Sequence, residues 1–144
     1  MDYSWRDIAL VCVRFGRHAY YLAGLPSNSA TLRILGLIER IGPMRVTDIA
    51  ELEKCTQATA SNLVARLRKE GLIRPDADPQ DKRAQLLYLT QEGAARLERF
   101  RTKLAEGLEV EANVVTPAEK EIVDAAMPIL LRLVREGPRE RKRH

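Results

Sequence analysis

The sequence predicts a mainly α-helical protein with one small β-hairpin. Two observations predict this class. Apolar residues recur at intervals of three and four along several long stretches, and two short runs of strand-forming residues flank a turn that contains proline. A chain of 144 residues can bury a core without disulfides, and its 45% hydrophobic and 31% charged residues are typical of a soluble, globular, helix-rich domain.

The first helix is predicted over residues 5–22. Ser4 lies directly before it as an N-cap, with Asp7 three residues further on. Gly24 and Pro26, in the stretch GLPSNS, end this helix because glycine is flexible and proline lacks an N–H. One face of the helix is apolar at helical spacing and carries Ile8, Val11, Phe15, Ala19 and Leu22.

Two shorter helices are predicted next. The first covers residues 29–41 and is ended by a Gly-Pro pair. Residues 44–46 are predicted to form a short extended piece. Thr47 is then expected to cap a helix over residues 48–55, with Asp48 favourably placed at the positive end of the helix dipole.

A fourth helix is predicted to begin at its N-cap Thr56 and to extend to about Glu70, where Gly71 ends it. A β-hairpin follows, with strands over residues 72–74 and 85–89. Prolines in the intervening segment favour a turn. The buried stripe of the fourth helix is predicted to be Ala60, Leu63, Val64 and Leu67.

Two long helices complete the chain. Thr90 is expected to cap the first, and the capping box TPAE, residues 116–119, opens the second with proline at its first position. Pro128 is expected to kink that last helix. The resulting order of helices and strands, with a helix-turn-helix followed by a hairpin, predicts a winged helix. The apolar stripes are Ala94, Leu97, Phe100, Leu104 and Leu108, then Ile122, Val123, Ala126, Ile129, Leu130, Leu133 and Val134.

The fourth helix carries side chains suited to contact DNA. Glutamine and asparagine can pair with adenine, arginine can pair with guanine, and short hydroxyls suit phosphates. A helix N-terminus also favours a phosphate. A surface helix whose polar side chains face water is the alternative interpretation of this pattern. The polar residues concerned are Thr56, Gln57, Thr59, Ser61, Asn62 and Arg66.

The predicted turn of the hairpin is basic. The segment DPQDKR places Lys82 and Arg83 at the expected tip, with Asp81 beside them. A projecting arginine can enter a narrow minor groove, where the negative potential is enhanced. Asp81 is expected to pair with Arg83 and hold it extended. An ordinary solvated turn with a surface ion pair is the alternative.

Three segments together resemble the MarR (multiple antibiotic resistance regulator) family of winged helix-turn-helix regulators. They are ASNLVARLRKEGLIRP, the wing DPQDKR and the helix entry LYLTQEG. The resemblance covers nearly the whole chain and implies a homodimer on a pseudo-palindromic operator in double-stranded DNA. It implies a DNA-binding region over residues 30–90, dimerisation helices over 4–23 and 91–135, and a basic tail over 136–144.

The resemblance also implies roles for individual residues. Those expected to face the major groove are Gln57, Ala58, Thr59, Ser61, Asn62 and Arg66, beside the helix cap Thr56. Those expected at the wing tip are Asp81, Lys82 and Arg83, with Arg83 in the minor groove. Those expected at the dimer interface are Val11, Phe15, Leu108, Ile122, Ile129, Leu130 and Leu133.

Two departures from the family pattern concern specificity. Many members have Thr-Arg where this chain has Ser61-Asn62, so a guanidinium that could contact guanine or phosphate is missing. Lys82 stands where arginine is common, which keeps the charge but loses the planar fork. The operator sequence therefore stays open.

Several functions find no support in the sequence. There is no Ser/His/Asp arrangement, phosphate-binding glycine loop or metal-ligand cluster, so neither an enzyme nor a bound metal or cofactor is expected. No apolar run reaches the roughly 20 residues of a membrane span, and no signal peptide is recognised, so a cytoplasmic protein without a membrane partner is expected.

The leading hypothesis is a dimeric transcriptional regulator, a repressor that a lipophilic or phenolic small molecule could release. A winged-helix module that binds another protein is one alternative, because residues 45–85 carry eight cations and seven anions and are nearly neutral. A redox-sensing regulator that uses Cys12 or Cys55 is another. For Cys55 the favoured interpretation is a small buried hydrophobe at the turn, and for Cys12 it is a place in the dimer core.

Overall fold

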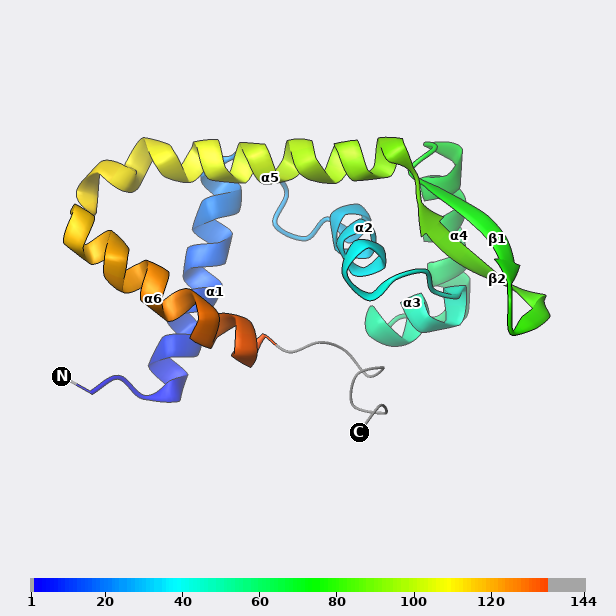
Figure 1. Cartoon of the computed structure of the whole chain (residues 1–144), viewed down its shortest axis with the longest axis horizontal. Coiled ribbons are helices and arrows are strands. Elements are labelled where there is room, and N and C mark those ends of the chain that lie inside the picture. Colours follow the sequence, from blue (N-terminus) through cyan, green and yellow to red (C-terminus); the bar gives the residue numbers. More distant parts are fainter. Residues whose placement is uncertain (1, 135–144) are drawn as a thin grey trace. The chain divides into compact units, whose positions relative to one another are not determined.

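The computed structural model describes residues 2–134 and confirms the predicted class, with helices and one two-stranded hairpin (Figure 1). The basic tail predicted over residues 136–144 lies outside the described residues. The chain divides into two units, residues 1–108 and 109–144. The elements are α1 (Trp5–Leu22), α2 (Ala30–Ile41), α3 (Val46–Leu52), α4 (Gln57–Lys69), β1 (Ile73–Asp78), β2 (Asp81–Leu89), α5 (Gln91–Glu111), the 3-10 helix η1 (Ala112–Val114) and α6 (Pro117–Leu133).

Side-chain caps start most of the helices where the sequence predicted them. The Ser4 hydroxyl accepts the Asp7 N–H at 3.3 Å, and the Asp7 carboxylate accepts the Ser4 N–H at 3.0 Å. The Thr56 hydroxyl accepts the Thr59 N–H at 3.1 Å at the start of α4. Thr116 caps α6 in a capping box with Glu119, and Pro117 occupies the first turn. These local bonds satisfy N–H groups that have no partner within the helix.

The predicted start of α3 was wrong. The helix begins at Val46 rather than after Thr47, because the Asp48 carboxylate accepts the backbone N–H of Arg45 at 2.7 Å and so caps the helix from inside its first turn. It also ends earlier than predicted, since the chain adopts a left-handed conformation at Lys54, with φ 51°.

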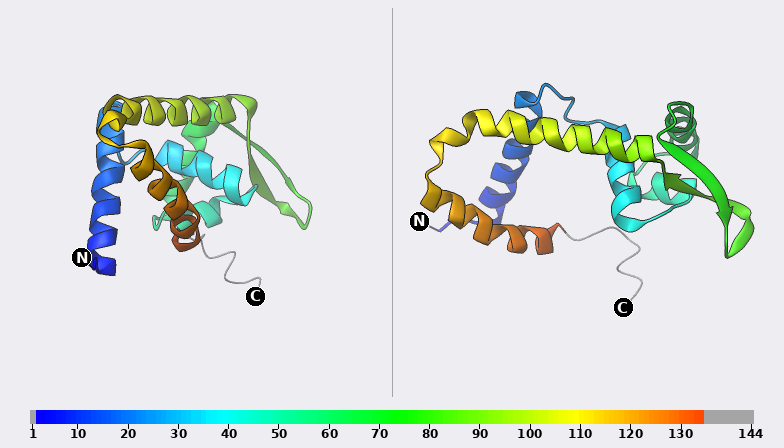
Figure 2. Two further views of the ribbon diagram at one scale, coloured as in Figure 1. Left: turned by 60° about the vertical axis from the view of Figure 1, so that its left-hand side comes forward. Right: turned by 45° about the horizontal axis from the view of Figure 1, so that its top comes forward.

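The core of the first unit lies between α2, α3, α4, the hairpin and the first turns of α5, whose arrangement Figure 2 shows. Met44 and Leu87 form an isolated antiparallel bridge that attaches the base of the hairpin to the segment before α3. Met44 thus supplies the short third strand-like segment of a winged helix. It lies within the extended piece that was predicted over residues 44–46. The largest fully buried side chains are Ile34, Leu35, Met44, Ile49, Leu67, Leu72 and Leu87.

The end of α4, the hairpin and the start of α5 meet at one junction. Gly71 has φ +72°, and the N–H of Leu72 donates to the Leu67 carbonyl at 3.0 Å, which closes α4 with a Schellman motif. The Thr90 hydroxyl donates to the Gly71 carbonyl at 2.6 Å and accepts the Gly93 N–H at 3.0 Å. One threonine thus caps α5 and holds the end of α4.

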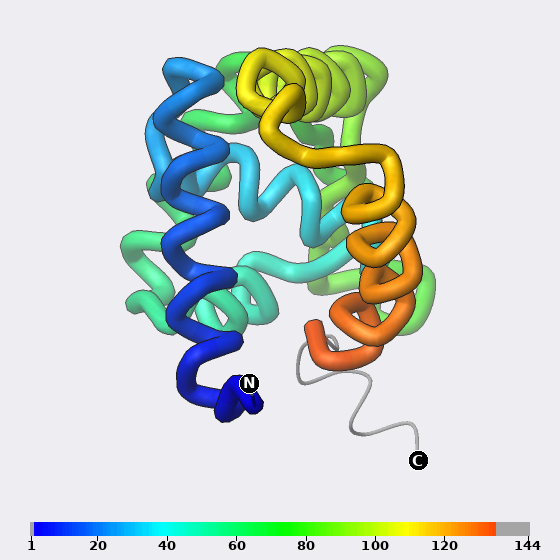
Figure 3. Tube along the Cα trace, turned by 90° about the vertical axis from the view of Figure 1, so that its left-hand side faces the viewer, coloured from blue at the N-terminus to red at the C-terminus, as the bar shows by residue number. Residues whose placement is uncertain are grey.

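Helix α1 is continuous (Figure 3), and Ala19 is its one buried residue. Its C-terminal end contacts α5 closely at Gly107, where an added Cβ would lie 2.8 Å from the Ala23 nitrogen. The rings of Tyr20 and Phe100 pack at a centroid distance of 5.6 Å. The rest of the apolar face predicted for α1 is largely exposed, with Val11 and Phe15 among the exposed residues.

Helix α6 belongs to the second unit and has no buried residue. It continues through Pro128, so proline does not end it. A helix with several exposed branched apolar side chains has a face suited to a protein partner. The exposed large apolar residues in α6 are Ile122, Val123, Met127, Ile129, Leu131 and Leu133.

Candidate nucleic-acid interface

Helix α4 buries one side and exposes the polar side chains that the sequence singled out. Ala60, Val64 and Leu67 are buried in the core, and Leu63 is half-buried. This matches the predicted stripe and leaves the remaining positions accessible to a ligand. The exposed residues are Thr56, Gln57, Ala58, Thr59, Ser61, Asn62 and Arg66.

Arg66 is held by its own protein scaffold. One of its terminal nitrogens donates to the Thr31 hydroxyl at 3.1 Å, and its Nε lies 3.8 Å from a Glu70 carboxylate oxygen. Thr31 lies in the first turn of α2 and is 35 residues away in sequence. No local pattern could have found this contact. It fixes the arginine at the edge of α4, beside the start of α2.

The hairpin is longer than predicted, and its tip is different. Strands β1 and β2 pair from Ile73 opposite Leu89 to Ala77 opposite Gln85, and Asp78 then pairs with Asp81. The tip is therefore Pro79-Gln80. Lys82 and Arg83 were predicted at the tip, but they lie beyond it on β2. The difference in register leaves residues 82–84 as a bulge on β2 that has no partner on β1.

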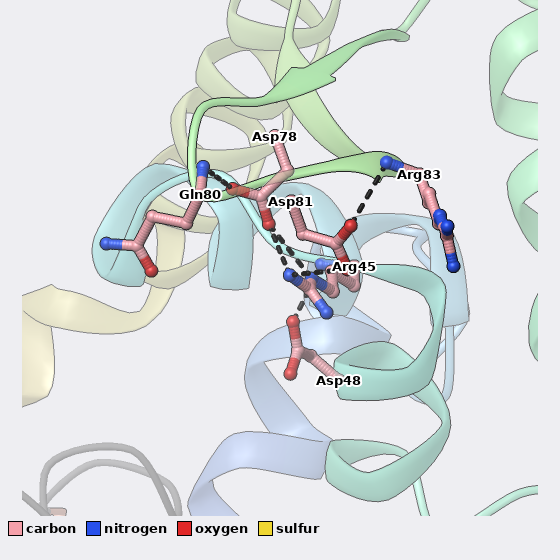
Figure 4. Close-up of polar contacts among 6 residues, drawn as sticks. All are labelled: Arg45, Asp48, Asp78, Gln80, Asp81 and Arg83. Atoms are coloured by element: carbon pink, nitrogen blue, oxygen red, sulfur yellow. Dashed lines mark hydrogen bonds and ion pairs between the residues drawn. The ribbon is translucent and has the colours of Figure 1, made fainter.

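The expected ion pair between Asp81 and Arg83 is also not formed among the described residues. The Asp81 carboxylate instead accepts the backbone N–H of Arg83 at 3.1 Å. The Arg83 side chain extends away from this carboxylate (Figure 4), and its guanidinium makes no ion pair within residues 2–134. An exposed arginine in a bulge is accessible to an anionic partner such as phosphate.

Sequence reasoning missed Arg45. Its guanidinium donates to one Asp78 carboxylate oxygen from Nε at 3.0 Å and from Nη2 at 2.6 Å (Figure 4). The Gln80 N–H, with help from Arg45, holds the pKa of the Asp78 carboxyl below its usual value. Asp78 is 7% exposed and is the one buried charged residue in the described part of the chain. One local signal could have indicated Asp78: in an Asp-Pro turn, the aspartate often accepts the backbone N–H two residues further on.

The two cysteines lie in different surroundings. Cys55 is half-buried and packs against the core, as expected for a small hydrophobe before α4. Cys12 is exposed on α1 in the single chain. Among the aromatic residues of α1, Trp5, Phe15 and Tyr21 are exposed, and Tyr20 packs on Phe100.

Within residues 2–134, no group of three or more His, Cys, Asp and Glu side chains is placed to hold a metal ion. None of the described helices combines the length and the apolar character needed to cross a membrane.

Comparison with known proteins finds relatives among transcriptional regulators. Residues 28–84 match the sequence profile of the MarR family. The chain is 30% identical to YxaD, an uncharacterized HTH-type transcriptional regulator of Bacillus subtilis (strain 168), over 113 residues that cover 75% of this chain and 79% of the relative.

Two solved structures share the fold. Wild-type apo MarR from E. coli has a TM-score of 0.69 at 19% identity, over 91% of this chain and 98% of that one. MepR of S. aureus, solved as a DNA complex, has a TM-score of 0.58 at 22% identity, over 91% and 97%. The profile match, the YxaD relative and the shared fold agree with one another. This chain therefore belongs to the MarR family and is a transcriptional regulator with a DNA-binding winged helix, not an enzyme.

Proposed function

We propose that the protein is a homodimeric repressor that binds a pseudo-palindromic operator through α4 and the wing of each protomer. The observation that carries this proposal is the exposed polar row of α4 together with a hairpin bulge that carries two exposed cations, Lys82 and Arg83, neither of which makes an ion pair within residues 2–134. In this arrangement α4 contacts base edges in the major groove, and Arg83 enters the minor groove beside it. Occupying the operator blocks transcription.

Dimerisation is supported by unpartnered apolar surface in both units. Val11 and Phe15 on α1 are exposed, as are Ile122, Ile129 and Leu133 on α6. Leu108 and Leu130 are half-buried. Exposed branched and aromatic residues in such numbers favour a protein interface, and a second copy of the chain offers the same surfaces for a symmetric one.

The proposal is tested by selecting binding sites from fragmented genomic DNA and measuring affinity by anisotropy at two salt concentrations. Enrichment of a two-fold-symmetric site with a steep salt dependence supports it. A folded dimer that enriches no site would favour the alternative of a winged-helix module that binds a protein. A reporter transcribed from the selected site separates repression from activation.

Release by a small molecule is the regulatory part of the proposal. A surface pocket of about 300 Å³ lies within the first unit and combines apolar groups with cations, a lining suited to an aromatic anion. The same anisotropy assay with 4-hydroxybenzoate added tests this part, and unchanged affinity at millimolar probe would contradict it. The lining includes Leu25, Leu32, Phe100, Arg96, Arg99 and Lys103.

Arg83→Ala is expected to weaken binding to every duplex and to lower the salt slope by about one for each protomer, because one cation fewer displaces counterions from the phosphates. Anisotropy over a range of salt concentrations measures both effects. Lys120→Ala is the control, since it removes a cation that pairs with Asp124 on α6. Equal affinity of Arg83→Ala and the parent would show that the wing is placed wrongly on DNA.

Asn62→Ala is expected to weaken binding to the selected operator by about 1–3 kcal/mol and to relax base preference at one or two positions. An amide that pairs with a base edge carries sequence information, whereas a phosphate contact does not. Competition with single-base variants of the operator measures the preference. Asn113→Ala, which truncates an exposed asparagine in η1, should change neither quantity. A uniform loss across all operator variants would assign Asn62 to the phosphates instead.

A further inference from the structure

Arg45 connects α3 to the far end of the hairpin. It lies directly before α3, where the Asp48 carboxylate accepts its backbone N–H at 2.7 Å. Its guanidinium reaches across to Asp78 at 2.6 Å and lies 3.8 Å from a carboxylate oxygen of Asp81. Figure 4 shows the guanidinium between these two carboxylates. Arg45 therefore contacts both residues that flank the Pro79-Gln80 tip.

Each of these two carboxylates uses its second oxygen to hold the backbone of the wing. Asp78 accepts the Gln80 N–H at 2.9 Å, and Asp81 accepts the Arg83 N–H at 3.1 Å. The contacts thus form a chain from the start of α3, through Arg45 and the two aspartates, to the backbone of Arg83. Asp78 is buried, and a buried carboxylate that lost its cation would have to rearrange toward water.

The pairing of the two strands is interrupted at the bulge. Residues 82–84 have no Cα partner on β1, because the register shifts between the Ala77–Gln85 pair and the Asp78–Asp81 pair. The base of the hairpin is attached separately, through the bridge between Met44 and Leu87. At this end of the hairpin the Asp78 carboxylate holds the backbone of the tip at Gln80, the Asp81 carboxylate holds the bulge at Arg83, and both aspartates face Arg45.

We propose that Arg45 is a positioning residue for the wing, which acts through Asp78 and Asp81 to hold the bulge and so directs Arg83 toward DNA. Arg45 also neutralises two carboxylates that would otherwise repel the phosphate backbone. This inference rests on the proposed DNA contact of the wing. The alternative is that Arg45, whose side chain is 38% exposed, contacts DNA itself.

The first experiment measures the wing without DNA. Amide hydrogen exchange of Gln80 and Arg83 is compared by NMR in the parent, Arg45→Met and Arg33→Met. Arg33 makes a similar ion pair with Glu53 at 2.7 Å, but this pair lies between α2 and the end of α3. Arg45→Met should speed exchange of both wing amides about tenfold or more, whereas Arg33→Met should leave them unchanged. Unchanged exchange in Arg45→Met would overturn the inference, whatever the protein does with DNA.

The second experiment is a double-mutant cycle with Arg83→Ala on the selected operator. Arg45→Met should weaken binding about tenfold in the parent and less than about twofold in the Arg83→Ala background, because Arg45 acts through Arg83. Arg45→Lys should restore part of the affinity, since it keeps a charge without the planar fork. Effects that multiply in full would assign a direct DNA contact to Arg45 and overturn the positioning role.

Unfolding midpoints of all variants are measured alongside. The change in affinity should exceed any change that global stability predicts, and a loss that simply follows unfolding would reduce Arg45 to a structural residue. If the parent itself binds no duplex, the proposed function fails. The exchange experiment still judges the link between Arg45 and the wing, so the two failures are distinguishable.

Discussion

Leu133→Asp is expected to convert the dimer into monomers and to lower operator affinity by about a hundredfold or more. Leu133 is 56% exposed in the single chain and lies on the apolar side of α6 with Ile122 and Ile129. A carboxylate buried there without a cation would cost more than the packing it replaces. Monomers lose the second half-site, whose contribution through effective concentration is about a hundredfold or more.

Leu131→Asp is the matched control for this change. Leu131 is 66% exposed and, at helical spacing, lies with Lys120 and Asp124 on the polar side of the same helix. It introduces the same charge at a similar exposure and should leave the dimer intact. Sedimentation gives the oligomeric state and anisotropy gives the affinity. A dimeric Leu133→Asp, or a Leu131→Asp that dissociates equally, would show that the dimer uses another surface.

Gly93→Ala is expected to destabilise the winged helix by about 3 kcal/mol, the upper part of the usual cost of overpacking. A Cβ at this position would lie 2.1 Å from the Leu72 carbonyl oxygen and 2.8 Å from Leu89 Cδ1. The Leu72 oxygen belongs to the backbone, so the clash can be relieved only if α5 moves away from the segment directly before β1. That movement would also stretch the hydrogen bond from the Thr90 hydroxyl to the Gly71 carbonyl.

Gly36→Ala is the control for Gly93→Ala. Gly36 lies within α2, and a Cβ there meets nothing within 4 Å. Alanine should raise the free energy of unfolding by up to about 1 kcal/mol, since glycine is the poorer helix former. Urea unfolding of both variants measures the difference. Equal stability of the two variants would mean that the α5 junction can adjust without cost.

The junction at Gly93 gives a physical meaning to the segment LYLTQEG. Leu87 is buried in the core, Thr90 caps α5 and binds the end of α4, and Gly93 admits the Leu72 carbonyl. The spacing of these residues is set by the first turn of a helix that must begin directly against a strand. The same contacts place the hairpin relative to α4, on which the DNA-binding surface depends.

The wing is attached at two places that differ in kind. Its base is held by backbone hydrogen bonds between Met44 and Leu87, the shorter at 2.9 Å, within the buried core. Its far end is held by the ion pair between the partly exposed Arg45 and the buried Asp78. A backbone bridge tolerates changes of side chain, whereas the ion pair depends on two side chains. Substitutions at the far end should therefore alter DNA binding more than folding.

Local signals predicted much of this molecule. The caps at Ser4, Thr56, Thr90 and Thr116 were confirmed because each acts on an N–H three residues away, within the window that a sequence pattern covers. The predicted start of α3 was wrong because Thr47 and Asp48 are both residue types that can cap a helix. Asp48 caps the helix by accepting the backbone N–H of Arg45, so the helix begins at Val46.

The sequence by itself determined the order of the helices and strands, their caps and the polar row of α4, because hydrophobic period and capping depend on neighbours within a few residues. Only the tertiary structure decided where Arg83 lies, since the three-residue difference in strand register that creates the bulge has no local signature. It alone brought Arg45 to Asp78 and Arg66 to Thr31, which are 33 and 35 residues apart. Such pairs form because packing of the core brings their elements together, and the specificity of the pairing lies in that packing rather than in either segment.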